Sequence, residues 1–351
     1  MKYIRLLLFP FSLLYGLAIA VRHLLYDRNW LTRTAVGIPT IVVGNLAVGG
    51  TGKSPMVEYL VRALSADYRI AVLSRGYGRR TKGYREVRAD DDASLVGDEP
   101  LQFKRKFPHI TVAVCEKRVA GIRRLEASHD LVLLDDAFQH RALVPGFAIL
   151  LFDFKATLRD PHVLLPAGNY RDLRCRRRHA DIMVVTKTPE GATAAQQDRI
   201  ACKLAVGTVP LLYASIQYDA LVPLGDEELP VPADAQTLVV TGIANPAPFV
   251  EFAARQYAVA GHVAFPDHHA FTDGDIERIA ARFAQIKEAN KILVTTEKDA
   301  MRLRAYSAFF QSRKTPVYYV PIRAVFGQSD EALLLAQVRQ YLERASAERH
   351  R

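Results

Sequence analysis

The sequence predicts an α/β fold built on a parallel sheet with helices on both faces, followed by a smaller C-terminal α/β domain. Three observations support this prediction. Short apolar segments of strand length recur up to residue 186, with helical stretches between several of them. One segment leads through a glycine-rich turn directly into a helix. An acidic, proline-rich segment at 223–235 then separates a second strand–helix unit from the first.

The N-terminal region predicts a membrane-associated helix over residues 1–27. Residues 6–21 carry no charge, and basic residues such as Arg5 and Arg22 flank them. A helix of this run is roughly 24 Å long, shorter than the ~30 Å hydrocarbon core of a bilayer. A cleaved signal peptide ending near Ala20 and a buried core helix are the alternatives. We favour an uncleaved helix that lies in, or shallowly crosses, the bilayer, because the next segment is predicted to bind ATP, which the periplasm lacks.

The first predicted strand, at 39–43, is followed by a phosphate-binding loop of the P-loop NTPase type. Its glycines let backbone N–H groups turn toward phosphate oxygens, and the following helix adds a positive N-terminal dipole. Lys53 is expected to reach the β- and γ-phosphates of ATP, and the Ser54 hydroxyl to ligate Mg²⁺. The residues expected to bind the nucleotide are Gly49, Gly50, Thr51, Gly52, Lys53 and Ser54.

The loop departs from the strict GxxxxGKS pattern at one position, where Ala47 stands in place of glycine. We expect Gly49 and Gly50 to supply the flexibility instead. The alternative is a plain glycine-rich strand-to-helix turn, which would not require Gly-Lys-Ser at the helix start.

A second apolar strand, Leu131–Leu134, ends in the pair Asp135-Asp136. A carboxylate at the C-terminal end of a buried parallel strand is suited to hold Mg²⁺. Adjacent residues alternate direction along a strand, so we expect one aspartate to face the metal directly and the other through water. Turns also use such pairs, so the prediction depends on the phosphate loop. Gln139 and His140 follow and are expected to shape the same edge.

The remaining segments complete two domains, a P-loop domain over 28–222 and a smaller α/β domain over 236–335. The smaller domain opens with a strand and a helix and closes with a strand at 317–321 before a polar helical tail. The strands predicted for the first sheet lie at 39–43, 69–74, 110–114, 131–134, 148–152 and 181–186.

The composition excludes several classes of protein. Half of the residues are hydrophobic and 24% are charged, which excludes a disordered chain and a polytopic membrane protein. The three cysteines lack CxxC spacing, so we expect no disulfide framework, no zinc site and a reducing compartment. The net charge of +10 indicates an anionic partner. The densest basic cluster, at 171–179, suits an anionic lipid surface or a substrate phosphate, and the chain shows no RNA- or DNA-binding module.

Seven motifs occur in order along the chain, namely GNLAVGGTGKSP, RGYGR (75–79), VGDEP (96–100), LLDDAFQH (133–140), LPAGNYRD (165–172), TGIANP (241–246) and FPDHHAF (265–271). Together they resemble the tetraacyldisaccharide 4'-kinase family of Gram-negative bacteria. The resemblance implies transfer of the γ-phosphate of ATP, with Mg²⁺, to the 4'-hydroxyl of a tetraacyldisaccharide 1-phosphate. It also implies a membrane-associated enzyme at the cytoplasmic face of the inner membrane. We expect neither a nucleic-acid ligand nor an obligate protein partner.

The chain departs from the family pattern at three positions. Ser54 stands where the family usually has threonine, and both residues offer a hydroxyl to Mg²⁺. Ala137 stands where glycine is usual. Asp172 stands where glutamate is usual, which shortens a carboxylate arm and leaves its role open.

The resemblance also implies site residues. Asp98 resembles the catalytic base, although the N-cap of a helix at 100–107 is the alternative. A histidine of FPDHHAF is expected to reach the site from the second domain and pair with that base, and we favour His268 over His269. Arg118 resembles an arginine near the phosphates, with a solvated helix face as the alternative. Tyr77 is expected to contact either the nucleotide or the acceptor.

Two other functions fit part of the pattern. A membrane-associated P-loop ATPase that switches a protein partner would share the phosphate loop and the apolar helix, but it would not need VGDEP or FPDHHAF. A nucleic-acid-binding protein is suggested by charge alone. The sequence leaves open the tolerated acyl chains, the oligomeric state, and whether the N-terminal helix spans the bilayer or lies flat.

Overall fold

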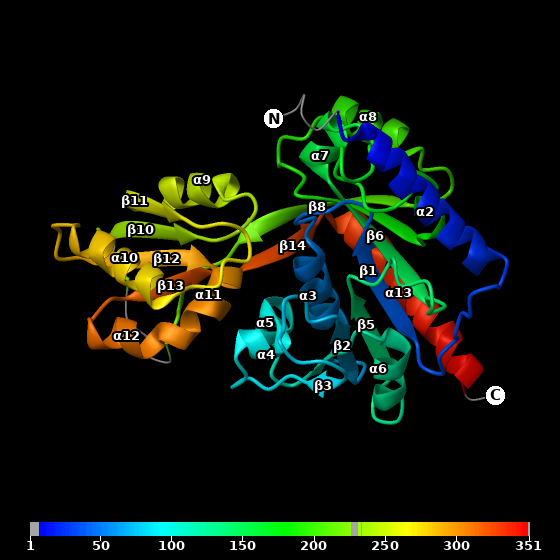
Figure 1. The fold of residues 1–351 in the computed structure, drawn as a ribbon, viewed down its shortest axis with the longest axis horizontal. Helices are drawn as coiled ribbons and strands as arrows, with labels where there is room; N and C mark the ends of the chain where they lie inside the picture. The colour runs from blue at the N-terminus through cyan, green and yellow to red at the C-terminus, as the bar shows by residue number, and fades with distance from the viewer. Residues whose placement is uncertain (1–6, 226–230, 233, 350–351) are drawn as a thin grey trace.

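The computed structural model describes residues 7–225, 231–232 and 234–349. The chain forms two α/β domains that lie side by side, each built on its own sheet (Figure 1). The chain leaves the large domain along one strand and returns along its antiparallel partner, Ile322–Phe326. These two strands run between the domains in Figure 1.

The large sheet contains nine strands in the order β14-β8-β7-β6-β1-β5-β2-β4-β3. Neighbouring strands are parallel, except that β14 is antiparallel to β8 and β3 is antiparallel to β4. The strands are β1 (Thr40–Asn45), β2 (Ile70–Ser74), β3 (Arg85–Glu86), β4 (Thr111–Val114), β5 (Leu131–Asp135), β6 (Phe147–Asp153), β7 (Ile182–Thr186), β8 (Leu211–Tyr218) and β14 (Ile322–Phe326).

Helices cover both faces of this sheet because its central strands are apolar on both sides. Along β1, Ile41 and Val43 pack with the helix that follows the phosphate loop, whereas Val42 packs with α6 on the opposite face. The helices of the large domain are α3 (Lys53–Leu64), α4 (Ala93–Val96), α5 (Asp98–Lys106), α6 (Arg118–Leu125), α7 (Phe154–Arg159), the 3₁₀ helix η1 (Arg174–His179), α8 (Ala194–Leu204) and α13 (Gln328–Arg349).

The small sheet contains five strands in the order β11-β10-β12-β13-β9. Its strands are β9 (Val222–Pro223), β10 (Gln236–Thr241), β11 (Ala258–Ala264), β12 (Lys291–Thr296) and β13 (Val317–Val320). The helices of this domain are α9 (Ala247–Gln256), α10 (Asp273–Ala284), α11 (Glu297–Leu303), the 3₁₀ helix η2 (Arg304–Tyr306) and α12 (Ser307–Ser312). The helix α11 packs directly on α5 of the large domain.

All six strands predicted for the large sheet are present, but the predicted end of the small domain at residue 335 is wrong. The strand at 317–320 is not the last one, because β14 follows it and pairs with β8 in the large sheet. Burial of Ala324 and Phe326 against the large domain drives this return. The tail helix α13 then packs on the large domain, where the Tyr341 hydroxyl accepts a hydrogen bond from the Thr40 N–H at 3.1 Å and the Tyr341 ring packs against Phe147. Residues 226–230 and 233 of the predicted linker lie outside the described residues.

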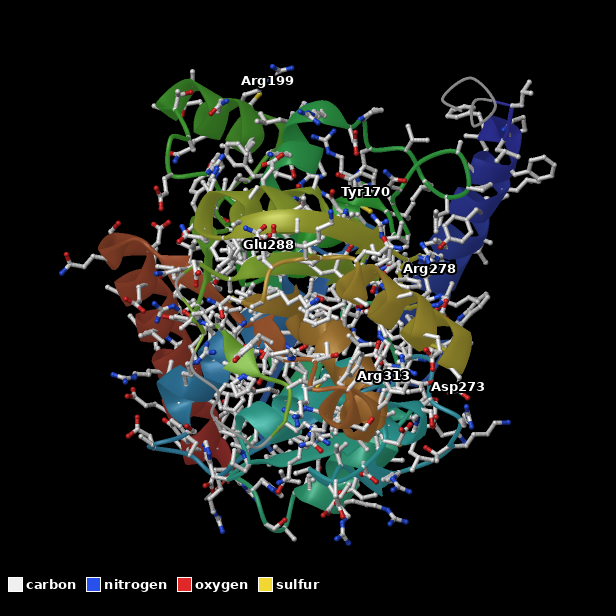
Figure 2. The ribbon with its side chains drawn as sticks, turned by 90° about the vertical axis from the view of Figure 1, so that its left-hand side faces the viewer. Tyr170, Arg199, Asp273, Arg278, Glu288 and Arg313 are labelled. Atoms are coloured by element: carbon white, nitrogen blue, oxygen red, sulfur yellow. The ribbon has the colours of Figure 1, made fainter. Side chains whose placement is uncertain are left out.

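The N-terminal helix α2 (Phe9–Asp27) lies on the outside of the large domain (Figures 1 and 2). Only Ser12 and His23 are buried, so the core-helix alternative is wrong. Leu14 and Leu17 are more than 60% exposed, and the helix has a mean hydropathy of 1.3, enough by length and composition to cross a membrane. Residues 1–6 of the predicted segment, including Arg5, lie outside the described residues.

Polar contacts attach the inner face of α2 to the large domain. Ser12 donates to the carbonyl of Leu164 at 2.9 Å. His23 lies 2.7 Å from the Asp172 carboxylate, with both side chains buried. Burial favours the neutral form of Asp172, but the hydrogen bonds from His23 and the Leu173 N–H, together with nearby positive charge, outweigh it and lower the pKa. The carboxylate whose role the sequence left open therefore anchors the N-terminal helix.

Candidate active site

The phosphate loop connects β1 to α3 in the expected strand–loop–helix arrangement. Gly52 is the N-cap of α3 with φ +80°, and Gly49 has φ +105°, so both need the left-handed freedom of glycine. Gly50 is not among the positive-φ residues, so the flexibility expected at Gly49 and Gly50 belongs to Gly49 and Gly52. Ala47 also keeps a negative φ and forms a bridge with Tyr170, so its Cβ causes no strain.

Two side chains fix the shape of the loop from neighbouring strands. Asn45, at the end of β1, donates to the Thr51 hydroxyl at 2.6 Å. Thr186, at the end of β7, donates to the Thr51 carbonyl at 2.8 Å. The loop is thereby held with the first turn of α3 free to present its N–H groups, which is the arrangement that binds phosphate.

Lys53 begins α3 and lies beside an acidic group at the end of β5. Its Nζ is 4.0 Å from Asp136 Oδ2. The same carboxylate accepts two hydrogen bonds from Arg171. Asp136 has φ +49° and follows the last residue of β5, so the expectation that the two aspartates alternate along one strand is wrong. Burial opposes ionisation of Asp136, but Arg171 and Lys53 lower its pKa.

Asp135 is fully buried at the end of β5, where it has the surroundings of a metal ligand. Ser74 donates to Oδ2 at 3.1 Å, and Oδ1 has no hydrogen-bond partner among the described residues. Burial raises the pKa of Asp135, and the charges of Glu99 and Asp136 raise it further. A divalent cation at Oδ1 would remove this cost. Ser54, in the first turn of α3, carries the other oxygen expected to ligate it.

Among the described residues, no group of three or more histidine, cysteine, aspartate or glutamate side chains is arranged so that it could hold a metal ion by itself. The predicted site does not require such a group, because in it one serine hydroxyl and one or two aspartates hold Mg²⁺ and nucleotide phosphates complete its shell. The residues present therefore fit Mg²⁺ held together with a nucleotide rather than in a protein cage.

Arg118 is buried at the start of α6, so the alternative of a solvated helix face is wrong. It donates to the carbonyl of Cys115 at 2.6 Å and to that of Asp135 at 3.4 Å. Burial lowers the pKa of Arg118, and the charges of Asp135 and Asp136 oppose that shift. The guanidinium group therefore sits against the acidic edge of the sheet.

Gln139 and His140 also lie at this edge, as expected. Gln139 donates to the carbonyl of Asn45 at 2.7 Å and so ties the segment after β5 to the start of the loop. Burial lowers the pKa of His140 to about 4, and the charges of Arg118, Arg22 and Arg75 contribute to this shift. His140 is therefore neutral at pH 7 and adds no charge to the site.

Asp98 is the first residue of α5, and Gly97 is the N-cap, so the N-cap interpretation of Asp98 is wrong. Its carboxylate instead faces the small domain. Oδ2 lies 3.5 Å from His268 Nδ1 and 3.0 Å from Arg302 Nε. Burial opposes ionisation, but the His268 hydrogen bond and the charges of Arg302 and Lys298 outweigh it and lower the pKa of Asp98. Asp98 is thus an ionised carboxylate at neutral pH.

Of the two histidines in FPDHHAF, His268 is the one that reaches Asp98, as expected. It has φ +57°, and its ring centroid lies 5.6 Å from that of the exposed Tyr77. His269 instead bonds Asp275 at 2.9 Å in the N-terminal capping box of α10. The preference for His268 over His269 therefore agrees with the geometry.

Helix α5 connects the acidic end of β5 with the small domain. Gly97, the N-cap of α5, packs against Gly76, which lies two residues after Ser74, and the Ser74 hydroxyl bonds Asp135. The start of α5 thus lies near the end of β5, and the charge of Glu99 raises the pKa of Asp135. Glu99 also pairs with Lys298 of the small domain at 3.7 Å. The candidate base and the candidate metal ligand are therefore carried close together.

Sequence reasoning missed three cations at the site. Arg171 binds Asp136, whereas Arg302 and Lys298 approach Asp98 and His268 from α11. Arg171 lies within the LPAGNYRD motif, which gave a signal that we read only as surface charge. Arg302 and Lys298 belong to none of the seven motifs, and only the fold brings them to the site.

The basic cluster at 171–179 is divided between the interior and the surface of the large domain. Arg171 is held by Asp136, and Arg176 is buried near Asp27 and Arg141. Arg174 donates to the carbonyl of Lys203. Arg171 and Arg176 therefore support the interior, whereas Arg174 and Arg178 remain exposed on the surface.

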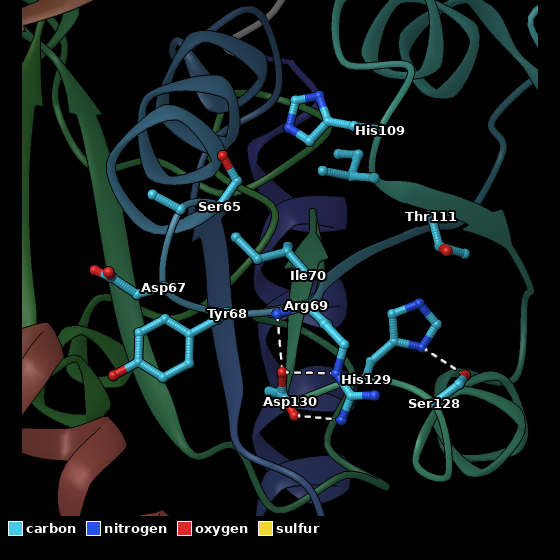
Figure 3. Close-up of a pocket in the computed structure, with 12 residues that line it drawn as sticks. Ser65, Asp67, Tyr68, Arg69, Ile70, His109, Thr111, Ser128, His129 and Asp130 are labelled. Carbon is cyan, nitrogen blue, oxygen red and sulfur yellow. Dashed lines mark hydrogen bonds and ion pairs between the residues drawn. The ribbon is translucent and has the colours of Figure 1, made fainter.

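A separate cavity of about 410 Å³ lies at the opposite end of the strands (Figure 3). It is lined by residues at the N-terminal ends of β2, β4 and β5, whereas ligands of parallel sheets gather at the C-terminal ends. Asp130 in this cavity already bonds Arg69 at 2.8 and 3.0 Å, and Ser128 bonds His129. These groups satisfy one another, so this cavity is not the candidate active site.

The chain is similar in sequence and in fold to known proteins. The family model described as tetraacyldisaccharide-1-P 4'-kinase matches residues 4–342. A tetraacyldisaccharide 4'-kinase of Flavobacterium johnsoniae is 38% identical over 98% of this chain and 100% of its own length. One from Bacteroides thetaiotaomicron is 40% identical over 92% of this chain and 90% of its own length. A crystal structure of LpxK from Aquifex aeolicus in complex with ATP matches with a TM-score of 0.76 and 29% identity, covering 97% and 99% of the two chains.

Proposed function

The chain belongs to the tetraacyldisaccharide-1-P 4'-kinase family, and we propose that it transfers the γ-phosphoryl group of ATP to the 4'-hydroxyl of a tetraacyldisaccharide 1-phosphate. The observation that carries this proposal is the pairing of Asp98 with His268 across the domain interface, at the edge where the phosphate loop and Asp135 lie. A phosphate loop alone would suit many ATPases. A half-buried, ionised carboxylate near it supports an acceptor hydroxyl that must lose a proton.

The phosphate loop and α3 bind the nucleotide phosphates, and Lys53 neutralises the β- and γ-phosphates. Ser54 and Asp135, with Asp136 nearby, would hold Mg²⁺, which supplies a Lewis acid that balances charge on the transferred group. Arg118 adds a buried positive charge at the same edge, where the transition state gathers negative charge.

Asp98 orients the 4'-hydroxyl and accepts its proton as the oxygen bonds to the γ-phosphorus. The bond between that phosphorus and the β–γ bridging oxygen breaks, and ADP leaves with the electron pair. His268 is positioned to stabilise Asp98 and to relay the proton away. Tyr77, which is 74% exposed beside His268, is available to contact the arriving sugar.

The exposed apolar side of α2 supports binding of the enzyme to the membrane that holds its lipid acceptor. A helix of 19 residues is about 28 Å long, and its polar contacts all lie on the side that faces the protein. We infer that the helix stays attached to the folded domain and presents its apolar side to the inner membrane at the cytoplasmic face, where ATP is available.

The test is incubation of the purified protein with γ-labelled ATP, Mg²⁺ and a tetraacyldisaccharide 1-phosphate in detergent micelles. We expect label on the disaccharide at the 4'-position, strict dependence on Mg²⁺, and no label on an acceptor whose 4'-hydroxyl is already phosphorylated. ATP hydrolysis without a labelled lipid, stimulated by a protein partner, would instead favour the ATPase alternative.

A further inference from the structure

One cation at the domain interface belongs to none of the seven motifs, yet it touches residues of several of them. Arg302, in α11, is 8% exposed in its side chain. Its Nε lies 3.0 Å from Asp98 Oδ2, and its Nη2 lies 3.4 Å from Asp299 Oδ1. Its Nη1 donates to the carbonyl of His269 at 3.0 Å and to that of Gly242 at 3.4 Å. VGDEP, TGIANP and FPDHHAF therefore meet at this one side chain.

We propose that Arg302 is a positioning residue for the phosphoryl transfer, which holds the Asp98 carboxylate in place from the small domain. The inference rests on the proposed function, because it assigns Arg302 a role at the same base. Nη1 donates to two backbone carbonyls, whereas Nε and Nη2 lie within ion-pair distance of Asp98 and Asp299 without forming hydrogen bonds. The planar fork of arginine permits contacts on three sides, which a lysine ammonium cannot reproduce.

The surroundings of Arg302 are built to fix its orientation. Asp299 is fully buried, and its Oδ2 accepts hydrogen bonds from the Gly242 N–H at 2.8 Å and from the Thr296 hydroxyl at 2.7 Å. A Cβ on Gly242 would lie only 2.9 Å from Asp299 Oδ1, which explains why this position in TGIANP requires glycine. Asp299 is thus locked in place and orients the arginine that reaches Asp98.

The charges around Asp98 come from every element packed against it. His268, Lys298 and Arg302 approach from the small domain, while Glu99, Asp267 and Asp299 are the acidic neighbours. Lys298 pairs with Glu99 and approaches His268 at 3.1 Å. Among the described residues of the small domain, Arg302 therefore makes the shorter ion-pair contact with the Asp98 carboxylate, at 3.0 Å against 3.5 Å for His268.

The test compares Arg302→Met and Arg302→Lys with Arg313→Met. Arg313 is an exposed arginine of the same domain, paired with Glu277 on its outer surface (Figure 2). We expect Arg302→Met to lower kcat about ten- to hundredfold with little change in the KM for ATP. Because Asp98 must be ionised to accept a proton, loss of the cation should also move the acidic limb of the pH profile of kcat/KM about one pH unit higher.

Arg302→Lys separates charge from position. It should keep the acidic limb near that of the wild type but recover only part of kcat, because an ammonium group cannot bind Asp98, Asp299 and two carbonyls together. Asp299→Asn removes the charge that orients Arg302 but keeps Arg302 itself, so it should also lower kcat. This variant replaces Arg302→Met in the test if Arg302→Met does not fold. Arg313→Met should behave as the wild type.

The same change can be read without turnover from the ¹³C resonance of the Asp98 carboxyl carbon, assigned with Asp98→Asn. Its titration midpoint should rise in Arg302→Met. A wild-type midpoint and a wild-type pH profile in that variant would overturn the inference, as would a kcat loss that only follows the unfolded fraction. Failure of the wild-type protein to label the lipid would overturn the proposed function instead, and the ¹³C titration would still report on Arg302.

Discussion

The residues proposed to hold the phosphates and those proposed to take the proton are brought together in different ways. Lys53 and Ser54 follow one strand and begin one helix, and Asp135 ends the adjacent strand of the same sheet. Asp98 and His268 instead come from two domains and meet only where α11 packs on α5. We call these the phosphate half and the base half of the site.

This difference indicates how each half should respond to damage. The phosphate half is fixed by the core of a nine-stranded sheet, so single changes at its surface should remove one contact without disturbing the rest. The base half depends on the docking of two domains, so a change at a distance from Asp98 can misalign it. Nucleotide binding and phosphoryl transfer should therefore separate in mutants of the interface.

The largest effect is expected in the phosphate half. Lys53→Ala should abolish transfer, because the β- and γ-phosphates lose their fixed cation and Asp136 loses a neighbouring positive charge. The measurement is label transferred to the lipid, together with ATP binding. Lys203→Ala is the matched control, because that ammonium bonds the backbone carbonyls of Thr157 and Leu158 elsewhere in the same domain. Activity within about threefold of wild type, well under 1 kcal/mol in barrier, would remove Lys53 from the site.

The next effect tests the base half alone. Asp98→Asn keeps the shape of the side chain but cannot accept a proton, so kcat should fall roughly 10²- to 10⁴-fold while ATP affinity changes little. Asp92→Asn is the matched control. Asp92 caps α4 by accepting from the Ser94 N–H, and asparagine caps a helix as well as aspartate does. A fully active Asp98→Asn enzyme would contradict the assignment of Asp98 as the base, and Asp135, Asp136 and His268 would then be the candidates to test.

The two halves also differ in how well the sequence predicted them. Gly52-Lys53-Ser54 and the strand ending in Asp135 predicted the phosphate half, because a P-loop is a local pattern that a strand, a turn and a helix reproduce wherever they occur. The six strands of the large sheet followed from apolar runs of the right length. The return of β14 to that sheet did not, because pairing with β8 more than a hundred residues earlier leaves no local signal.

The base half was predicted only in part. Asp98 and His268 were expected from motifs, but their partner Arg302 lies in a stretch that reads as an ordinary amphipathic helix. Asp299 and Arg302 are spaced by three residues, which on its own is typical of any surface ion pair. Their burial, and the direction of Arg302 toward Asp98, follow from the packing of α11 on α5. That packing is a property of the tertiary fold, and residue spacing along the chain does not contain it.

A buried ion network offers a way to weaken the domain contact without touching the site. Lys106 of α5 lies 2.7 Å from Glu58 in α3 and 2.9 Å from Glu297 in α11. Lys106→Met would leave the buried Glu297 carboxylate without this cation and Glu58 with only the longer Arg62 contact at 3.4 Å, and it should cost about 3 kcal/mol of unfolding free energy. Lys104→Met is the control, since that ammonium bonds backbone carbonyls instead of carboxylates. We expect transfer to fall more than ATP binding, and equal losses of both would contradict the separation of the halves.

The pH dependence of this variant has a definite sign. Burial raises the pKa of Glu297 to about 7, with the charge of Glu58 adding to the shift and Lys106 opposing it. A carboxylate with a raised pKa in the folded state favours folding when it is protonated, and this contribution is lost as the pH rises through that pKa. The stability deficit of Lys106→Met should therefore be largest above pH 7 and shrink toward pH 5. Chemical denaturation across this range measures it, and a deficit that grows at low pH would contradict the network.

The smallest effect on the chemistry is expected from the outer side of α2, which belongs to neither half. Leu14→Glu combined with Leu17→Glu adds charge to two side chains that are 63% and 61% exposed, and it leaves the contacts of Ser12 and His23 intact. If these leucines enter the membrane, their loss should cost roughly 2 kcal/mol of membrane binding, or about thirtyfold in vesicle partitioning. Turnover of a detergent-dispersed acceptor should stay near wild type, because His23 still anchors the helix through Asp172.

The control is Leu333→Glu, at an exposed apolar position on α13, which should not change partitioning. Wild-type partitioning of the double variant would show that α2 does not carry the membrane contact, and attention would then move to the exposed basic residues of η1.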